Sequence, residues 1–155
     1  FTLPRSAQLT QRSNQFNLRT IRYTEEKLKE LIGGDNKFTI TVSLKDKFGD
    51  YGITGVAIIK SQNENWIIDT FLLSCRILGK NLEFAIMKAL LDDAKTRGVK
   101  KIAGNFIPTA KNKPAENFYR DCGFKETGDG WYEFDISTDI FKSDHSGVGF
   151  IKSNI

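Results

Sequence analysis

The stretch LLSCRILGKNLEF (72–84) decides the fold, because it is expected to join a buried strand directly to a long helix. The mostly apolar residues up to Cys75 are typical of a buried strand, and from Asn81 onward apolar residues recur at helical spacing. Only Arg76-Ile77-Leu78-Gly79-Lys80 lies between. The first N–H groups of a helix lack intrahelical partners and carry partial positive charge, and a glycine lets a ligand approach the backbone closely. The turn therefore suits an anion such as a phosphate; a plain strand-to-helix turn with surface cations is the alternative.

The flanking segments are predicted from their periodicity and turn residues. FNLRTIRYT (16–24) can form an extended strand, and Thr24 is a suitable N-cap for a short helix after it. Residues 37–46 alternate apolar and polar side chains, as a half-exposed strand does. The remaining predicted elements are strands at 51–60 and 66–75, a helix at 81–97, a strand at 100–107, a helix at 113–124 and a last strand at 131–137.

This order, β-α-β-β-β-α-β-α-β, predicts an α/β (α+β) fold. The three strands between residues 37 and 75 have short connections, which favours an antiparallel meander. The strand–helix–strand unit at 66–107 requires a parallel pair with a right-handed crossover. We therefore expect a mixed, mostly antiparallel central sheet with helices on both faces.

Composition limits the class of protein. The chain has 155 residues, a net charge of +4 and a pI of about 9.0, with its basic residues scattered, so we predict no nucleic-acid partner. No apolar run is long enough for a membrane span, and no membrane association is expected. Two cysteines without C-x-x-C spacing predict reduced thiols in a cytoplasmic protein and no metal site.

Two motifs resemble the GNAT acyltransferase superfamily. The acyl-CoA loop of that superfamily has Arg or Gln, two residues, Gly, any residue, then Gly or Ala, and residues 76–81 match it except at Asn81. The second motif is carried by NKPAENFYRDCGF (112–124), with Asn112, Ala115, Phe118, Tyr119, Gly123 and Phe124 at the superfamily's spacing. The resemblance implies the GNAT fold over residues 16–137.

Three further stretches resemble the C-terminal domain of FkbH-like proteins, in which a HAD-type domain precedes a GNAT-like one. They are LPRSAQLTQRSNQFNLRTIRYT (3–24), WIIDTFLLSCRILGKNLE (66–83) and GNFIPTAKN (104–112). That family is associated with passing a glyceryl unit to an acyl carrier protein in polyketide or surface-glycan biosynthesis. This resemblance predicts that residues 1–15 link to an N-terminal HAD-type domain absent from this chain, and that 138–155 form a tail.

The resemblance also assigns candidate site residues. Leu73 and Cys75 would offer backbone groups to the pantetheine arm of a coenzyme A thioester or of an acyl carrier protein. The turn itself would hold the phosphate, through Arg76, Ile77, Leu78, Gly79, Lys80 and Asn81, and Asn112 belongs to the second motif. Tyr119 matches the tyrosine that protonates the departing thiolate.

Two more candidate catalytic residues follow from the strand at 66–75. Cys75, beside the proposed thioester, could be a nucleophile or a buried apolar residue. Asp69 interrupts an apolar run and, by period-2 spacing, shares a face with Phe71, Leu73 and Cys75. It could have a raised pKa and act as a base, or it could be paired for structure.

Three functions stay open. The first is an acyltransferase domain of an FkbH-like protein acting on a phosphopantetheine or coenzyme A thioester, with an acyl carrier protein as partner. The second is an acetyl-CoA-dependent N-acetyltransferase of a small amine. The third is a non-catalytic domain that docks the carrier protein.

Overall fold

The computed structural model describes residues 3–33, 36–46 and 49–142. A central sheet has the strand order β2-β3-β4-β5-β7-β6, formed by β2 (Lys37–Asp46), β3 (Gly49–Gln62), β4 (Asn65–Leu73), β5 (Lys101–Asn105), β7 (Trp131–Asp135) and β6 (Lys125–Gly128). β4 and β5 are parallel, and the other neighbours are antiparallel. The predicted mixed, mostly antiparallel sheet is confirmed.

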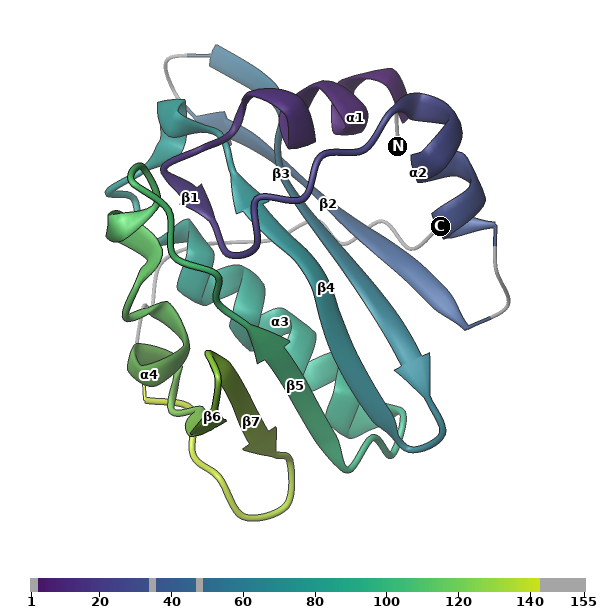
Figure 1. The fold of residues 1–155 in the computed structure, drawn as a ribbon, viewed down its shortest axis with the longest axis vertical. Helices are drawn as coiled ribbons and strands as arrows, with labels where there is room; N and C mark the ends of the chain where they lie inside the picture. The colour runs from purple at the N-terminus through teal and green to yellow at the C-terminus, as the bar shows by residue number, and fades with distance from the viewer. Residues whose placement is uncertain (1–2, 34–35, 47–48, 143–155) are drawn as a thin grey trace.

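Helices cover both faces of this sheet (Figure 1). On one face lie α1 (Leu3–Arg12) and α2 (Glu25–Ile32), packed on β3 and β4 around Leu28, Ile58 and Leu72. On the other face, α3 (Leu82–Thr96) and α4 (Phe118–Cys122) enclose a larger core that includes Ile68, Phe71 and Leu90. The two apolar layers bury the sheet from both sides, which is the arrangement that the element order requires.

Local sequence explains most of the boundaries. Thr24 caps α2, its hydroxyl accepting from the main-chain N–H of Lys27 at 3.2 Å, as predicted. Gly123 ends α4 at φ +95°, where a Cβ would lie 2.5 Å from the carbonyl oxygen of Ile140, so glycine is required there. The helix predicted at 113–124 begins instead with a 3₁₀ turn, η2 (Lys113–Ala115).

The N-terminal part differs most from the predictions. Residues 3–12 form helix α1, with Ala7 and Leu9 buried against the sheet, and the prediction that residues 1–15 link to a preceding domain stays a prediction. The strand predicted at 16–24 is reduced to β1 (Phe16–Asn17), because Thr20 turns the chain away at φ +56°. β6 was not predicted, since its four residues are all exposed and show no alternation. Within the described residues no helix has the length and apolarity needed to cross a membrane.

Gly104 in β5 is required by packing against α4. A Cβ there would lie 2.1 Å from the hydroxyl oxygen and 2.4 Å from Cζ of Tyr119, whose ring is held between Phe124 and Tyr132. We expect Gly104→Ala to lower the free energy of unfolding by about 2–3 kcal/mol in urea denaturation. Adding Tyr119→Phe should recover part of the loss, since it removes the nearest atom. A loss under about 0.5 kcal/mol would show that the ring moves freely.

Candidate functional site

The turn between β4 and α3 has the geometry that its sequence predicts. After β4 the chain makes a 3₁₀ turn, η1 (Cys75–Ile77), which Ser74 caps by accepting from the N–H of Arg76 at 3.4 Å. Gly79 follows at φ +79°, and Asn81 adopts the left-handed conformation at φ +56° as the residue before α3. These two left-handed residues, with Lys80 between them, shape the turn immediately before a 15-residue helix.

This turn is open to an anion. Among the described residues, the main-chain N–H groups of Gly79 and Asn81 have no hydrogen-bond partner, and a Cβ on Gly79 would meet nothing within 4 Å. Arg76 and Lys80 are exposed beside it, with the Lys80 ammonium 5.8 Å from the ring centre of Tyr51. The residues therefore fit a phosphate, although Asn81 contributes no side-chain cap.

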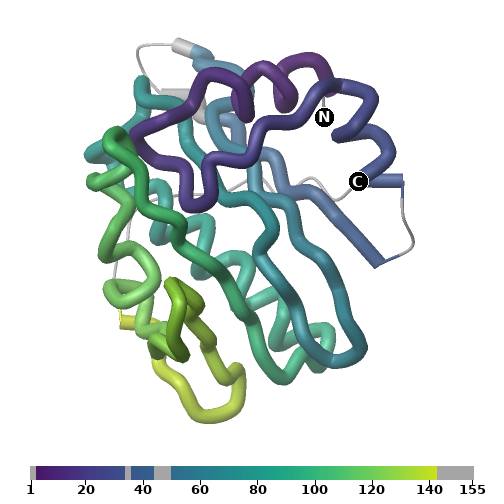
Figure 2. The backbone as a smooth tube through the Cα atoms, viewed as in Figure 1, coloured from purple at the N-terminus to yellow at the C-terminus, as the bar shows by residue number. Residues whose placement is uncertain are grey.

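The edge of β4 before this turn is not open to a pantetheine arm. Leu73 pairs with Gly55 of β3 on one side and with Phe16 of β1 on the other. Leu18 also donates its main-chain N–H to the carbonyl of Phe71 at 3.1 Å. A pantetheine arm pairing with this edge would need the same main-chain groups. Figure 2 shows the N-terminal segment that contains β1 beside the end of β4.

Asn112 is fully buried and serves the main chain. Its amide donates to the carbonyls of Asn17 at 3.0 Å and Ile107 at 2.9 Å, and it accepts from the N–H of Thr109 at 2.7 Å. In this structure Asn112 therefore braces β1 against the segment after β5, and its predicted ligand contact stays a prediction.

Tyr119 lies where β4 and β5 separate. Direct pairing of the two strands ends at Ile68 and Gly104, and the Tyr119 hydroxyl points at Gly104. Tyr119 is 1% exposed, and its hydroxyl has no hydrogen-bond partner among the residues that the structure describes. Burial raises the pKa of the Tyr119 hydroxyl, with Cys122 adding to the rise and Arg19 opposing it. The group is therefore protonated, but a raised pKa makes it a weaker proton donor than an ordinary tyrosine, so its role as the acid stays a prediction.

The expectation for Asp69 is wrong on two points. A β-bulge lies between the pairs Ile58–Thr70 and Ile59–Ile68, so Asp69 falls outside the period-2 count. Its carboxylate accepts from Tyr23, which belongs to the α1–α2 layer, whereas Phe71 and Leu73 face the opposite core. The bulge rotates the side chain away from the face assumed from spacing alone.

The second error concerns the charge of Asp69. Burial alone would raise the pKa of its carboxyl, but hydrogen bonds and charges from Lys60, Tyr23 and Arg19 together lower it below its ordinary value. Tyr23 donates from its hydroxyl at 2.6 Å, Arg19 lies 3.4 Å away, and Lys60 forms an ion pair with the same carboxylate. Asp69 is thus an ionised, paired group that fixes the chain after β1 to the bulge, as the structural alternative expects, and its role as a base stays a prediction.

We expect Asp69→Asn to lower the free energy of unfolding at pH 7 by about 2–4 kcal/mol, because it leaves two cations without their carboxylate. In the wild type the folded-state pKa lies below the unfolded value, so this stabilisation is present at neutral pH and is lost as pH falls below about 4. Urea denaturation at pH 7 and pH 3 measures both effects. Equal losses at the two pH values would contradict the ionised pairing.

Cys75 is exposed and lies in the 3₁₀ turn rather than at the end of the strand. The reading of Cys75 as a buried apolar residue is therefore wrong, and its role as a nucleophile stays a prediction. Cys122 is the buried cysteine, and burial raises the pKa of its thiol, which makes it unreactive.

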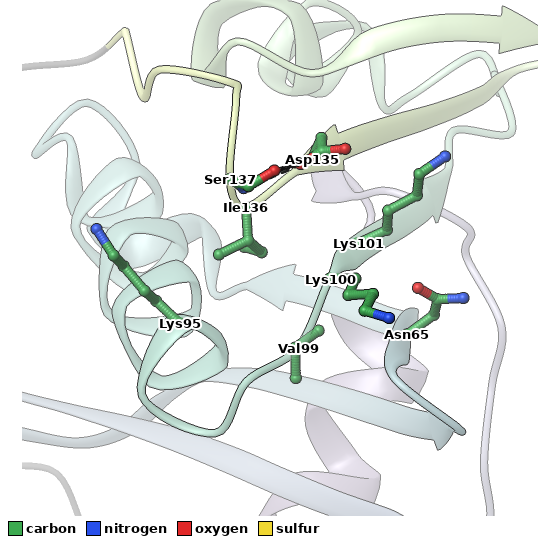
Figure 3. Close-up of a pocket in the computed structure, with 8 residues that line it drawn as sticks. All are labelled: Asn65, Lys95, Val99, Lys100, Lys101, Asp135, Ile136 and Ser137. Atoms are coloured by element: carbon green, nitrogen blue, oxygen red, sulfur yellow. Dashed lines mark hydrogen bonds between the residues drawn. The ribbon is translucent and has the colours of Figure 1, made fainter.

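Two surface clefts lie apart from these residues. One, of about 660 Å³, is at the opposite end of α3, where its lining includes Lys95, Lys100, Lys101 and Asp135 (Figure 3). The other, of about 360 Å³, lies beside the end of β5 and the β6–β7 turn. No predicted site residue lines either cleft.

Sequence reasoning missed the cations around Asp69 and the position of β1. Arg19 and Lys60 come from different elements, so spacing could not bring them to one carboxylate. The amide-rich SNQFN (13–17) was the available signal for β1, since Asn17 and its neighbours fix that segment.

Comparison with known proteins identifies the family of this chain. Residues 7–124 match the Acetyltransferase (GNAT) family. The ribosomal-protein-S18-alanine N-acetyltransferase of Escherichia coli is similar in structure, with a TM-score of 0.66, 18% identity, and coverage of 96% of this chain and 93% of that one. The PaiA N-acetyltransferase of Thermoplasma acidophilum in complex with coenzyme A gives a TM-score of 0.60 at 18% identity, covering 73% of this chain and 72% of that one.

A GNAT-family acetyltransferase from Staphylococcus aureus has a TM-score of 0.58 at 13% identity and covers 73% of this chain and 76% of that one. At these identities the likeness shows the fold alone. No curated protein sequence matches the chain. The family match spans most of the sequence and contains the strand–turn–helix and the region around Tyr119. The chain therefore belongs to the GNAT acetyltransferase family.

Proposed function

We propose that this chain is an acyltransferase domain acting on a phosphopantetheine thioester, within an FkbH-like protein that passes a glyceryl-type acyl unit to an acyl carrier protein. The observation that carries the proposal is the turn at 74–81, with two left-handed residues, unpaired N–H groups on Gly79 and Asn81, and flanking cations. Such a turn holds one phosphate of a carrier arm or the pyrophosphate of coenzyme A.

A bound thioester supplies an activated acyl group, and the chain supplies the groups around it. Gly79 and Asn81 hold phosphate oxygens through their main-chain N–H groups, and Arg76 and Lys80 add positive charge. Tyr119 supplies a protonated hydroxyl at the point where β4 and β5 part. Cys75 places an exposed thiol at the start of the turn, as a candidate acceptor of the acyl group.

The proposed partners are an acyl carrier protein and an N-terminal HAD-type domain of the same polypeptide. The net charge of +4 supports the first, because carrier proteins present acidic helices. The resemblance of 3–24, 66–83 and 104–112 to FkbH-like proteins supports the second.

Two alternatives have specific support. The similarity to N-acetyltransferases across nearly the whole chain favours an acetyl-CoA-dependent N-acetyltransferase of a small amine. The filled edge of β4 favours a domain that binds only the phosphate end of a carrier arm and transfers nothing.

Thermal-shift titrations with acetyl-CoA, holo carrier protein and apo carrier protein separate these functions, since a ligand that binds the folded state raises Tm. We expect the largest rise with the holo carrier and none with the apo carrier. A response to acetyl-CoA alone would favour the amine acetyltransferase, and holo-carrier binding without acyl transfer would favour docking. No response to any of the three would overturn the proposal.

A further inference from the structure

Residues 16–18 close the gap between β4 and β5. Phe16 pairs with Leu73, and Asn17 with Leu72. Leu18 then links β4 to the segment after β5, donating its N–H to the carbonyl of Phe71 at 3.1 Å and accepting from the N–H of Ile107 at 2.8 Å. Figure 1 shows β1 in this position, between the end of β4 and the segment that follows β5. Below it, β4 and β5 pair directly only as far as Ile68 and Gly104.

Residues 16–18 are buried, but few side-chain hydrogen bonds and ring contacts hold them in place. The amide of Asn17 donates to the carbonyl of Ser13 at 3.1 Å and accepts from the N–H of Thr20 at 2.8 Å. Asn112 donates to the carbonyl of Asn17, and the Phe16 ring contacts Phe118 at a centroid distance of 5.1 Å. A strand pair this short is weak by itself, so its release does not require the sheet to open.

Backbone strain at the end of the segment favours its release. Thr20 has φ +56°, a conformation that a β-branched residue adopts only at a cost, and within the described part of the chain its buried hydroxyl has no hydrogen-bond partner. Both costs are relieved if residues 16–20 leave the groove.

Below residues 16–18 lies the buried hydroxyl of Tyr119, which has no hydrogen-bond partner among the described residues. It points at Gly104, where the direct pairing of β4 and β5 ends. The turn at 74–81, proposed to bind the phosphate, follows the C-terminal end of β4. An arm running from that turn to Tyr119 would follow the edge of β4 that residues 16–18 now occupy.

We propose that residues 16–18 are a resident strand that a phosphopantetheine arm must displace in order to reach Tyr119. This inference rests on the proposed function. The segment and the arm compete for the same main-chain groups of Phe71 and Leu73, so the apparent affinity is the intrinsic affinity reduced by the fraction of molecules in which the segment is released.

The competition predicts opposite effects from two substitutions. Asn17→Ala removes both side-chain hydrogen bonds that shape the segment, so coenzyme A should bind about three- to tenfold tighter although Tm falls. Thr20→Gly relieves the strain of the closed segment, so coenzyme A should bind about threefold more weakly. Isothermal titration calorimetry with coenzyme A measures both.

Matched controls separate release from general destabilisation. Asn105→Ala removes a buried amide that donates to the carbonyl of Asp129 at 3.3 Å, and Asn63→Gly relieves a φ of +54° in the β3–β4 turn. Neither contacts residues 16–18 through a hydrogen bond, and both should leave the affinity unchanged.

Hydrogen exchange in the presence of coenzyme A tests the displacement directly. We expect the amides of Leu18 and Ile107, protected in the free protein, to exchange faster when coenzyme A is bound. If the Asn17→Ala variant binds coenzyme A and the wild type does not, that result would also support the resident strand. The inference would be overturned if coenzyme A binds while the Leu18 and Ile107 amides stay protected, and if Asn17→Ala binds it no more tightly than Asn105→Ala does. The proposed function would still stand in that case. If neither the wild type nor Asn17→Ala binds coenzyme A or holo carrier protein, the proposed function fails, and the inference with it.

Discussion

Tyr119→Phe should slow acyl transfer by about 10²–10⁴-fold while the affinity for the thioester stays unchanged. The hydroxyl is the only atom lost, and it lies buried and protonated where β4 and β5 separate. Because this hydroxyl has no hydrogen-bond partner within residues 3–33, 36–46 and 49–142, its removal should leave the free energy of unfolding within about 0.5 kcal/mol of the wild type. A large loss of rate without loss of stability is the signature of an acid rather than of a packing residue.

The matched control is Tyr132→Phe. Its ring stacks on Tyr119 at a centroid distance of 5.3 Å, so it tests whether any nearby tyrosine hydroxyl affects the rate. We expect a change of less than about threefold, as for a change away from the reacting atoms. Single-turnover transfer from the acyl donor to the carrier protein measures the rate. Equal rates for Tyr119→Phe and the wild type would remove Tyr119 from the mechanism.

Gly79→Glu should weaken coenzyme A binding about 100-fold, or ~2.7 kcal/mol. The glutamate carboxylate would stand in the open space beside the N–H groups of the turn, where it repels a phosphate. Its side chain would also have to adopt φ +79°, which disfavours the geometry of the cradle.

Gly98→Glu is the control for this change. Gly98 has φ +72°, is open to solvent, and lies at the other end of α3, so the backbone strain and the added charge are matched. We expect its coenzyme A affinity, measured by calorimetry, to stay within about twofold of the wild type, because solvent screens a charge that lies beyond one Debye length. Similar losses in both variants would mean that net charge, rather than the turn, controls binding.

The sequence predicted the parts of the fold in which one physical pattern dominates. The period-2 alternation of 37–46, the apolar run of 66–73 and the helical spacing of 82–96 each became the expected element. The left-handed conformation of Asn81 also follows from residue type, since asparagine tolerates it well.

Elements without such a pattern were missed. Four residues of α1 are buried, but two of them are Ser6 and Thr10, which blurs the apolar face that identifies a helix. The bulge at Asp69 leaves no local signal, because it depends on how β3 and β4 pair. The filled edge of β4 was equally invisible, since residues 16–18 reach it from far away in the chain.

The proposed function depends on the binding of a phosphate by the turn between β4 and α3. The most direct test is a titration of the ¹⁵N-labelled domain with coenzyme A, following amide resonances by NMR. We predict saturable shifts of the Leu78, Gly79 and Asn81 amides, absent in Gly79→Glu. Shifts confined to Lys95, Lys100 and Lys101 at the opposite end of α3, or no shifts at all, would contradict it.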